Sequence, residues 1–257
     1  MKNIFSRTLI NARRLCCLLM VLLSCNNKMV AQEKTGKDGF VKIFDGKALD
    51  GWEGDSTYWS VEDGKIVGVI TPATIIKRNT FLIWQGGVAA DFELKVEYKI
   101  SEGGNSGINY RSELVDDIPH ALRGYQCDID AANQYTGQNY EERRRCIIAF
   151  RGQKVTLPNV TEPLRSNIKD NVWTASIVTA SLGNVDSLKQ DINEGWNEVH
   201  IIAKGNRLQH FINGLLMSDV TDDDTVNRRL SGLLGVQVHV GPPMKVEYRN
   251  FRLKKLK

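Results

Sequence analysis

Cysteine is scarce in this sequence of 257 residues. Three of its five cysteines fall within the first 25 residues, which leaves Cys127 and Cys146 in the remainder. No Cys-x-x-Cys pair occurs, so the sequence holds no cysteine framework for a metal. In an oxidising compartment these two residues could form one disulfide, and two free thiols are the alternative.

Short catalytic motifs are also absent. The sequence contains no Gly-x-Ser-x-Gly elbow, no P-loop, no His-Glu-x-x-His helix and no Gly-x-Gly-x-x-Gly following a strand, which excludes the enzyme classes that these motifs define. The Glu-x-Asp-x-x-Glu strand of laminarinase-type glycosidases is missing as well. Glu141 and Glu142 are adjacent, so on a strand their side chains would face opposite sides. No motif therefore indicates the two carboxyl groups, about 5 Å apart, that a retaining glycosidase needs.

An excess of one charge is confined to the start of the chain. Lysine and arginine number 34 against 30 acidic residues, and four of these cations, Lys2, Arg7, Arg13 and Arg14, precede the apolar run Leu15 to Leu23. The remaining 30 cations balance the 30 acids. The rest of the chain is therefore close to neutral, which excludes nucleic acid as a partner.

The basic stretch and the apolar run have the layout of a signal peptide, and the run is too short for a membrane-spanning helix. It ends in Leu22-Leu23-Ser24-Cys25, which looks like a bacterial lipobox. We expect residues 1–24 to be removed, Cys25 to be lipidated, and residues 25–38 to form a flexible tether. The protein would then be a periplasmic or outer-membrane lipoprotein that meets the membrane through its lipid anchor only. The alternative is cleavage after Ala31, which would leave a soluble periplasmic protein beginning at Gln32.

From Gly39 onward the hydrophobic period is two. Phe92, Leu94, Val96, Tyr98 and Ile100 alternate with charged residues, as expected of a half-buried strand.

Turn pairs recur between such segments, and each can supply the positive φ of a tight hairpin. These pairs are Asp63-Gly64, Gly205-Asn206 and Asn213-Gly214. Helix is predicted only from Val185 to Ile192, and Pro158 to Gly183 is expected to be a long loop or insertion. The pattern predicts one all-β domain over residues 39–257, built as a sandwich or barrel.

Three predicted strands carry polar side chains opposite their apolar face. These side chains are Gln126, Asp128 and Asp130 on one strand, Gln237 and His239 on the second, and Asn109 and Arg111 on the third. Amide, carboxylate and guanidinium groups on rigid strands suit a polyhydroxylated ligand, which is bound through directional hydrogen bonds. The alternative is a set of polar residues satisfied beneath loops.

Several blocks of sequence resemble the 3-keto-disaccharide hydrolase family over residues 39 to about 256. They are Gly39 to Trp52, Trp59 to Gly68, Gly104 to Arg111, Gly124 to Asp128, Tyr135 to Glu142, Arg151 to Gln153, His210 to Gly214, Gln237 to Met244 and Tyr248 to Asn250. Much of that family has Glu-x-Gln-x-x-Asp in the middle block, where this chain has Gly124 at the glutamate position. No role of that glutamate carries over.

The resemblance implies a concanavalin A-like jelly-roll sandwich of two antiparallel sheets with a concave polar groove. It also implies cleavage of the glycosidic bond of a 3-keto-glucoside or related saccharide, by elimination alpha to the C-3 ketone followed by addition of water. A separate sugar 3-dehydrogenase would supply that substrate.

The groups that such a reaction needs can be placed on this sequence. We expect His239, Asp128 and Glu142 to act as base, acid and partner, with base and acid exchangeable. Substrate oxygens would bind to the side chains of Asn105, Asn109, Arg111, Gln126, Tyr140 and Gln237. No cofactor is required, and a divalent metal held by the three catalytic residues is the alternative. Two competing functions stay open, a non-catalytic carbohydrate-binding module and a structural or partner-binding surface lipoprotein.

Overall fold

The computed structural model describes residue 36 and residues 38–257. The expected signal peptide, the lipidation site Cys25 and nearly all of the expected tether lie outside these residues. Within the described part of the chain, no helix is long and apolar enough to cross a membrane.

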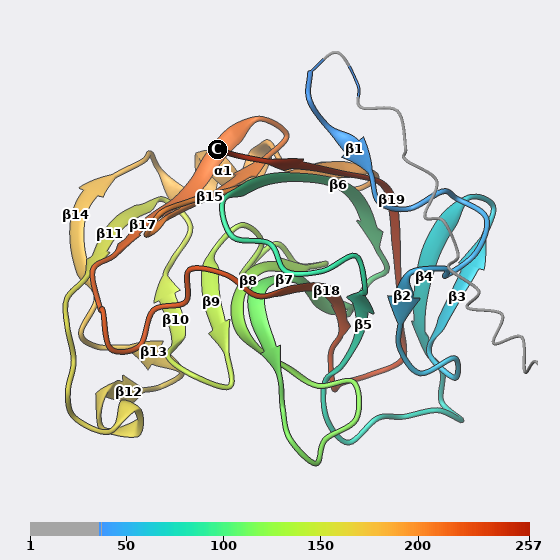
Figure 1. Ribbon diagram of the computed structural model, residues 1–257, viewed down its shortest axis with the longest axis horizontal. Coiled ribbons are helices and arrows are strands. Elements are labelled where there is room, and N and C mark those ends of the chain that lie inside the picture. Colours follow the sequence, from blue (N-terminus) through green and yellow to red (C-terminus); the bar gives the residue numbers. More distant parts are fainter. Residues whose placement is uncertain (1–35, 37) are drawn as a thin grey trace, which may run out of the picture. The chain divides into compact units, whose positions relative to one another are not determined.

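The domain is built from two sheets that lie as two layers, with β6 and β15 of one sheet above β7, β8 and β18 of the other (Figure 1). In spatial order, the ten-stranded sheet, sheet A, contains β14 (Ile177–Ser181), β11 (Gln153–Leu157), β17 (Leu215–Asp222), β16 (Arg207–Ile212), β15 (Asn197–Lys204), β6 (Phe92–Ile100), β19 (Met244–Lys255), β4 (Lys65–Ile70) and β3 (Trp59–Glu62), with β1 (Val41–Lys42) paired to β19.

The nine-stranded sheet, sheet B, contains β12 (Ile168–Lys169), β13 (Val172–Trp173), β10 (Cys146–Ala149), β9 (Asn139–Glu142), β8 (Leu122–Asp130), β7 (Asn105–Leu114), β18 (Leu233–Val238), β5 (Thr80–Trp84) and β2 (Trp52–Glu53). The helical elements are the 3-10 turn η1 (Leu164–Asn167) and the helix α1 (Val185–Gln190). Asn184 caps α1 by accepting hydrogen bonds from the backbone N–H groups of Asp186 and Ser187.

The predicted hairpins are confirmed. Asp63-Gly64 joins β3 to β4, while Gly205-Asn206 and Asn213-Gly214 join β15, β16 and β17 into a meander. Asp63 and Asn213 adopt positive φ, as these tight turns require.

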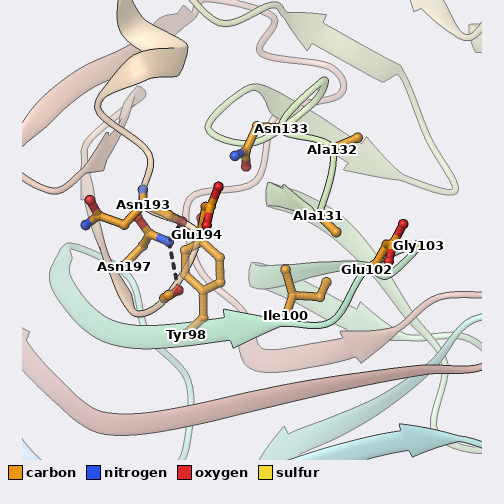
Figure 2. Close-up of a pocket in the computed structure, with 11 residues that line it drawn as sticks. Tyr98, Ile100, Glu102, Gly103, Ala131, Ala132, Asn133, Asn193, Glu194 and Asn197 are labelled. Atoms are coloured by element: carbon orange, nitrogen blue, oxygen red, sulfur yellow. Dashed lines mark hydrogen bonds between the residues drawn. The ribbon is translucent and has the colours of Figure 1, made fainter.

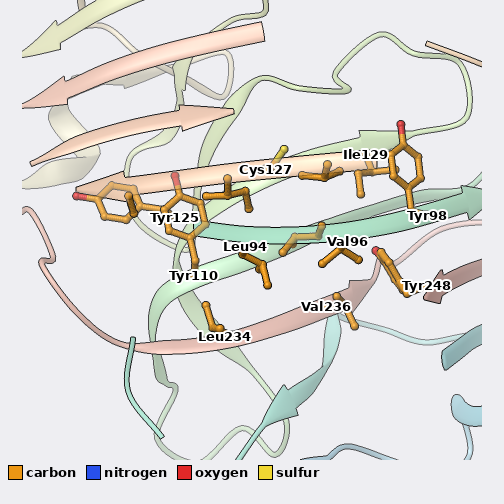
Figure 3. Packing of buried hydrophobic residues seen from close by; sticks show 14 of the residues in the cluster. Leu94, Val96, Tyr98, Tyr110, Tyr125, Cys127, Ile129, Leu234, Val236 and Tyr248 are labelled. Carbon is orange, nitrogen blue, oxygen red and sulfur yellow. The ribbon is translucent and has the colours of Figure 1, made fainter. Parts of the chain in front are cut away.

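The core lies between the sheets, and alternate residues of each strand point their side chains into it. Leu94 and Val96 of β6 face Cys127 and Ile129 of β8, and the buried ring of Tyr110 stacks on that of Tyr125 (Figure 3). The alternation predicted for β6 and β8 is therefore confirmed, and it leaves the other face of β8 free to carry polar groups.

The all-β jelly-roll architecture is confirmed, with three differences of detail. The pairs β10·β13 and β11·β17 are parallel, so both sheets are mixed rather than purely antiparallel. The expected loop from Pro158 to Gly183 contains three short strands and η1. β18 ends at Val238, so His239, expected on this strand, comes directly after it.

Candidate functional site

A groove of about 510 Å³ lies on the face of sheet B that points away from the core. Its lining comes from β7, β8, β9, β10 and β13 together with the loops that flank them. The lining residues are Asn79, Asn105, Gln126, Asp128, Tyr135, Gln138, Tyr140, Glu142, Ile147, Phe150, Asp170, Asn171, Val172 and His239.

Strand register explains why these side chains gather. Gln126 of β8 pairs with Asn109 of β7 on one side and with Tyr140 of β9 on the other, and Tyr140 pairs with Ile147 of β10. Residues paired directly across strands project from the same face of a sheet. These paired residues therefore form a single row across the floor of the groove. The row begins with the amides of Asn109 and Gln126 and ends with the apolar side chain of Ile147.

This face of sheet B is concave, so that side chains from strands far apart in the sheet come into contact. Glu142 on β9 and Gln237 on β18 are separated by β8 and β7, which at ~4.8 Å per strand is roughly 14 Å on a flat sheet. Nevertheless, Nε2 of Gln237 lies 3.4 Å from Oε2 of Glu142. Only curvature of sheet B, together with the length of these two side chains, brings the two groups into contact.

Glycine makes room beneath these side chains. A Cβ atom at Gly107 would collide with the amide carbon of Gln126, so Gln126 lies directly over this glycine. Gly124 pairs with Glu142 and has a φ of 152°, and a Cβ there would stand 2.5 Å from the hydroxyl of Ser112. The residue at the position of the family's glutamate therefore lies directly across from Glu142 on the neighbouring strand.

A continuous chain of hydrogen bonds links the two carboxyl groups of the groove. Gln237 donates from Nε2 to Oε2 of Glu142 (3.4 Å) and to Oε1 of Gln126 (3.2 Å). Gln126 in turn donates to Oδ1 of Asp128, and Gln138 donates to Oδ2 of Asp128, both at 2.6 Å. Each oxygen of Asp128 thus accepts one amide N–H, and the orientation of its carboxyl plane is set by neutral groups.

Burial shifts the ionisation of both carboxyl groups in the same direction. Burial raises the pKa of Asp128 to about 7, against the opposing effect of the hydrogen bonds from Gln138 and Gln126. Burial also raises the pKa of Glu142, and the nearby charge of Arg143 only partly offsets it. Asp128 can therefore carry a proton near neutral pH, which an ordinary surface aspartate cannot.

His239 follows the last residue of β18 and faces the same groove. Burial lowers its pKa below the usual value for histidine, so its imidazole is neutral at pH 7. Asn79 ties this segment to the carboxyl groups. It accepts a hydrogen bond from the backbone N–H of Val240 at 2.9 Å and donates to both oxygens of Glu142 at 3.3 and 3.4 Å.

The structure brings most of the predicted site residues together. Those that line the groove are Asn105, Gln126, Asp128, Tyr140, Glu142 and His239, and Gln237 joins them through its hydrogen bonds. Asn109 lies on the same face but is fully buried below the lining, and its amide atoms have no hydrogen-bond partner among the residues that the structure describes.

Arg111 does not join this group, and its expected position on the polar face is wrong. A bulge in β7 after Tyr110 gives Arg111 a φ of +46°, and its side chain turns toward the ends of β6 and β15 in sheet A. There it donates to the backbone carbonyls of Ala90 (2.9 Å) and Gly205 (2.7 Å) and pairs with Asp91. These contacts satisfy a buried guanidinium and leave none of it for a ligand in the groove.

Asp130 shares the polar side of β8 but has a structural role. Its carboxylate accepts hydrogen bonds from the backbone N–H groups of Gln134, Tyr135 and Thr136, which folds the loop between β8 and β9. That loop carries Gln138 into position beside Asp128.

Sequence reasoning missed Asn79, Gln138 and the apolar residues of the groove. Gln138 lies within a block that resembles the family and directly precedes β9, two residues before Tyr140, and this spacing could have identified it. Asn79 lies in an irregular segment before β5, where no periodicity indicates which way a side chain points.

Two questions from the sequence concern the pairing of the cysteines and the presence of a metal site. Cys127 and Cys146 are free thiols, the first of them buried. Over residues 38–257, no group of three or more histidine, cysteine, aspartate or glutamate side chains is placed to hold one metal ion.

A second and larger cavity, of about 600 Å³, lies beside Tyr98 and Ile100 at the end of β6 (Figure 2). Its carboxylates, Glu102 and Glu194, are exposed to solvent. Its amide Asn197 is occupied by carbonyls of its own loop, such as that of Asn193 at 2.9 Å. This cavity lacks a base and a buried acid, so the smaller groove is the candidate active site.

The fold and the groove define a class of protein, a jelly-roll β-sandwich whose concave face carries a buried acid, a neutral histidine and several amides. Within that class, the chain belongs to the family of 3-keto-alpha-glucoside-1,2-lyase-like domains, whose model matches residues 39–254.

Individual relatives are more distant. A 3-keto-disaccharide hydrolase from Bacteroides thetaiotaomicron is 36% identical over 97 residues, which cover 30% of this chain and 29% of that relative. The match thus spans less than a third of the relative's length.

Among solved structures, a candidate glycosyl hydrolase from Parabacteroides distasonis aligns with a TM-score of 0.52 at 20% identity, over 86% of this chain and 95% of that chain. A β-glucanase from Bacillus licheniformis aligns with a TM-score of 0.50 at 11% identity, over 87% of this chain and 100% of that chain. At such identities these likenesses show the fold alone.

Proposed function

We propose that this protein cleaves the glycosidic bond of 3-keto-glycosides by elimination followed by addition of water. The observation that carries the proposal is the pairing, in one groove, of a neutral imidazole with a carboxyl group whose pKa is about 7. Membership of the 3-keto-alpha-glucoside-1,2-lyase-like family supports the same chemistry.

The substrate itself supplies much of the reactivity. A ketone at C-3 acidifies the hydrogen on C-2, so a base can remove that proton and leave an enolate. Collapse of the enolate forms the C-1–C-2 double bond and expels the aglycone oxygen from C-1. One base, one acid and donors for the enolate oxygen are sufficient, and a positioned acid or base contributes about 10²–10⁴-fold.

The ionisation states in the groove support one assignment of these roles. His239 is neutral and accepts the C-2 proton, while protonated Asp128 donates its proton to the departing oxygen. Asn105 offers its amide N–H to oxygens of the bound sugar. Gln126 and Gln138 orient Asp128, and Glu142 orients Gln237.

Addition of water uses the same two groups in reverse. The Asp128 carboxylate removes a proton from water as the hydroxyl adds to C-1, and the His239 imidazolium returns a proton to C-2. The products are the 3-keto sugar and the free alcohol of the aglycone, and both residues recover their starting protonation states. A dehydrogenase that oxidises C-3 of the sugar must act beforehand.

The first experiment incubates the purified protein with a 3-keto-glucoside that carries a chromogenic leaving group. The unoxidised parent glucoside and a parallel reaction with chelator serve as controls. Release from the ketone alone supports the proposal, and loss of release with chelator would show that a metal takes part. Binding without release would favour a carbohydrate-binding module instead.

We also propose that the protein is exported and lipidated at Cys25. The expected result is incorporation of radiolabelled palmitate and recovery in the membrane fraction, both lost in Cys25→Ala. A labelled Cys25→Ala variant would contradict the proposal.

A further inference from the structure

The lining of the groove contains two kinds of side chain. The first are polar, namely the amides, Asp128, Glu142 and His239. The second are aromatic or aliphatic and are called the apolar wall here: Tyr135, Tyr140, Ile147, Phe150 and Val172.

The apolar wall is continuous with the part of the groove proposed to bind the sugar, because the cross-strand row that contains Gln126 extends into the wall. Gln126 pairs with Tyr140, Tyr140 with Ile147, and Ile147 with Val172. These four strands are successive neighbours, so the row spans roughly 14 Å at ~4.8 Å per strand. A sugar ring held at Gln126 leaves about 10 Å of this row for the group attached to it.

The wall exposes large apolar surface to the groove. Phe150 is 40% exposed and Tyr135 is 42% exposed, while Ile147 lines the groove as a buried side chain. Exposed apolar surface gathered in a concave site is typical of ligand contact.

Hydrogen-bonding capacity on this side is small. Aliphatic side chains offer none, and the hydroxyl of Tyr140 already donates to Oδ1 of Asn171 at 3.3 Å. Within the described lining, the remaining polar groups here are the hydroxyl of Tyr135 and the side chains of Asp170 and Asn171, the last two at the turn between β12 and β13. A second sugar would bring several hydroxyl groups against a wall with few groups to pair with them, which disfavours its binding.

We infer that the apolar wall is the aglycone subsite and that it selects glycosides of apolar or aromatic alcohols over glycosides of a second sugar. This inference rests on the proposed function, since it assigns the leaving-group side of the same groove. It differs in substrate from the disaccharide named for the relative described above.

The test compares 3-keto-glucosides whose aglycones are methyl, benzyl or a second glucose, each as both anomers. Methyl and benzyl alcohols are leaving groups of similar acidity, so a difference between them reports contact with the wall. We expect kcat/KM for the benzyl substrate to exceed that for the methyl and glucosyl substrates by about tenfold or more. Preference for the glucosyl substrate would overturn the inference.

Two variants locate the effect. Phe150→Ala should lower kcat/KM on the benzyl substrate about tenfold and leave the methyl substrate within about twofold. Leu114→Ala removes an exposed apolar side chain outside the groove and should change neither. Equal losses on the methyl and benzyl substrates in Phe150→Ala would overturn the inference. Val172→Thr, nearly isosteric, repeats the test without a change of volume.

A binding measurement separates the case in which the proposed reaction is wrong from the case in which the aglycone subsite is wrong. If no 3-keto-glycoside is cleaved, binding of the benzyl and methyl compounds is measured by calorimetry. Tighter binding of the benzyl compound that is lost in Phe150→Ala supports the subsite without the reaction. Equal binding of the two compounds contradicts the subsite.

Discussion

The outer face of β6 and the groove face of β8 follow the same alternating pattern and have different chemistry. On β6, Glu93, Lys95 and Glu97 face solvent and pair with charges on neighbouring strands, such as Lys254 with Glu93 at 3.2 Å. On β8, Gln126 and Asp128 are buried and contact neutral amides.

The difference shows in the ionisation of the carboxyl groups. Hydrogen bonds from Asn250 and Arg249 outweigh partial burial and lower the pKa of Glu97, so it stays charged, whereas burial without a cation raises that of Asp128 to about 7. A solvated face thus holds its charges, and the groove holds groups that can exchange protons near pH 7.

The largest expected effect is the loss of turnover on removal of His239, with His200 on the outer face of sheet A as the control. His239→Ala should lower turnover of a 3-keto-glucoside by about 10²–10⁴-fold, because the proposed base is lost. His200 lies on the outer face of sheet A, where it contacts Glu93 at 3.0 Å, and His200→Ala should keep full turnover. Full activity of His239→Ala would remove His239 from the mechanism.

The pH profile of kcat/KM should show two limbs. His239 must be neutral and Asp128 protonated, so activity should peak between the lowered pKa of His239 and about pH 7. Above pH 7 it should fall about tenfold per unit, after subtraction of the uncatalysed elimination. Asp128→Asn should abolish the alkaline limb and lower the plateau about 10²-fold. An unchanged alkaline limb in this variant would assign the acid to another group.

Gln237 tests the hydrogen-bonded chain between the carboxyl groups. Gln237→Ala removes donors to both Glu142 and Gln126 and should lower kcat about tenfold with little change in KM, because the acid loses its orientation. Gln209 projects from the outer side of β16, and Gln209→Ala is the matched control. A loss confined to KM in Gln237→Ala would indicate a substrate contact instead.

The smallest effect concerns stability. The pKa of Asp128 is 3.8 in the unfolded chain and about 7 in the folded protein. The free energy of unfolding should therefore fall as the pH rises from 3.8 toward 7. Between pH 5 and 7 this loss is on the order of 2 kcal/mol.

Denaturant unfolding at several pH values measures this loss. Asp128→Asn should remove it. Glu97→Gln should not alter this pH window, since a lowered pKa costs stability only when the pH falls below the unfolded value of 4.5. Parallel curves for wild type and Asp128→Asn would show that Asp128 does not titrate as proposed.

Much of the groove could be predicted because strand alternation is a local property. The apolar residues Tyr125, Cys127 and Ile129 point to the core, so Gln126 and Asp128 had to share the other face. The same reasoning failed at Arg111, where a bulge reverses the side chain. The carbonyls that hold it there belong to residues 21 and 94 positions away.

The amino-acid sequence by itself determined the all-β class, the hairpins and the polar face of β8, because each depends on a period of two and on the turn residues between strands. Only the tertiary structure decided that Glu142 meets Gln237, that Asn79 joins them, and that Asp128 is buried enough to raise its pKa. These features depend on the curvature of sheet B and on burial, which arise from contacts between residues far apart in the chain.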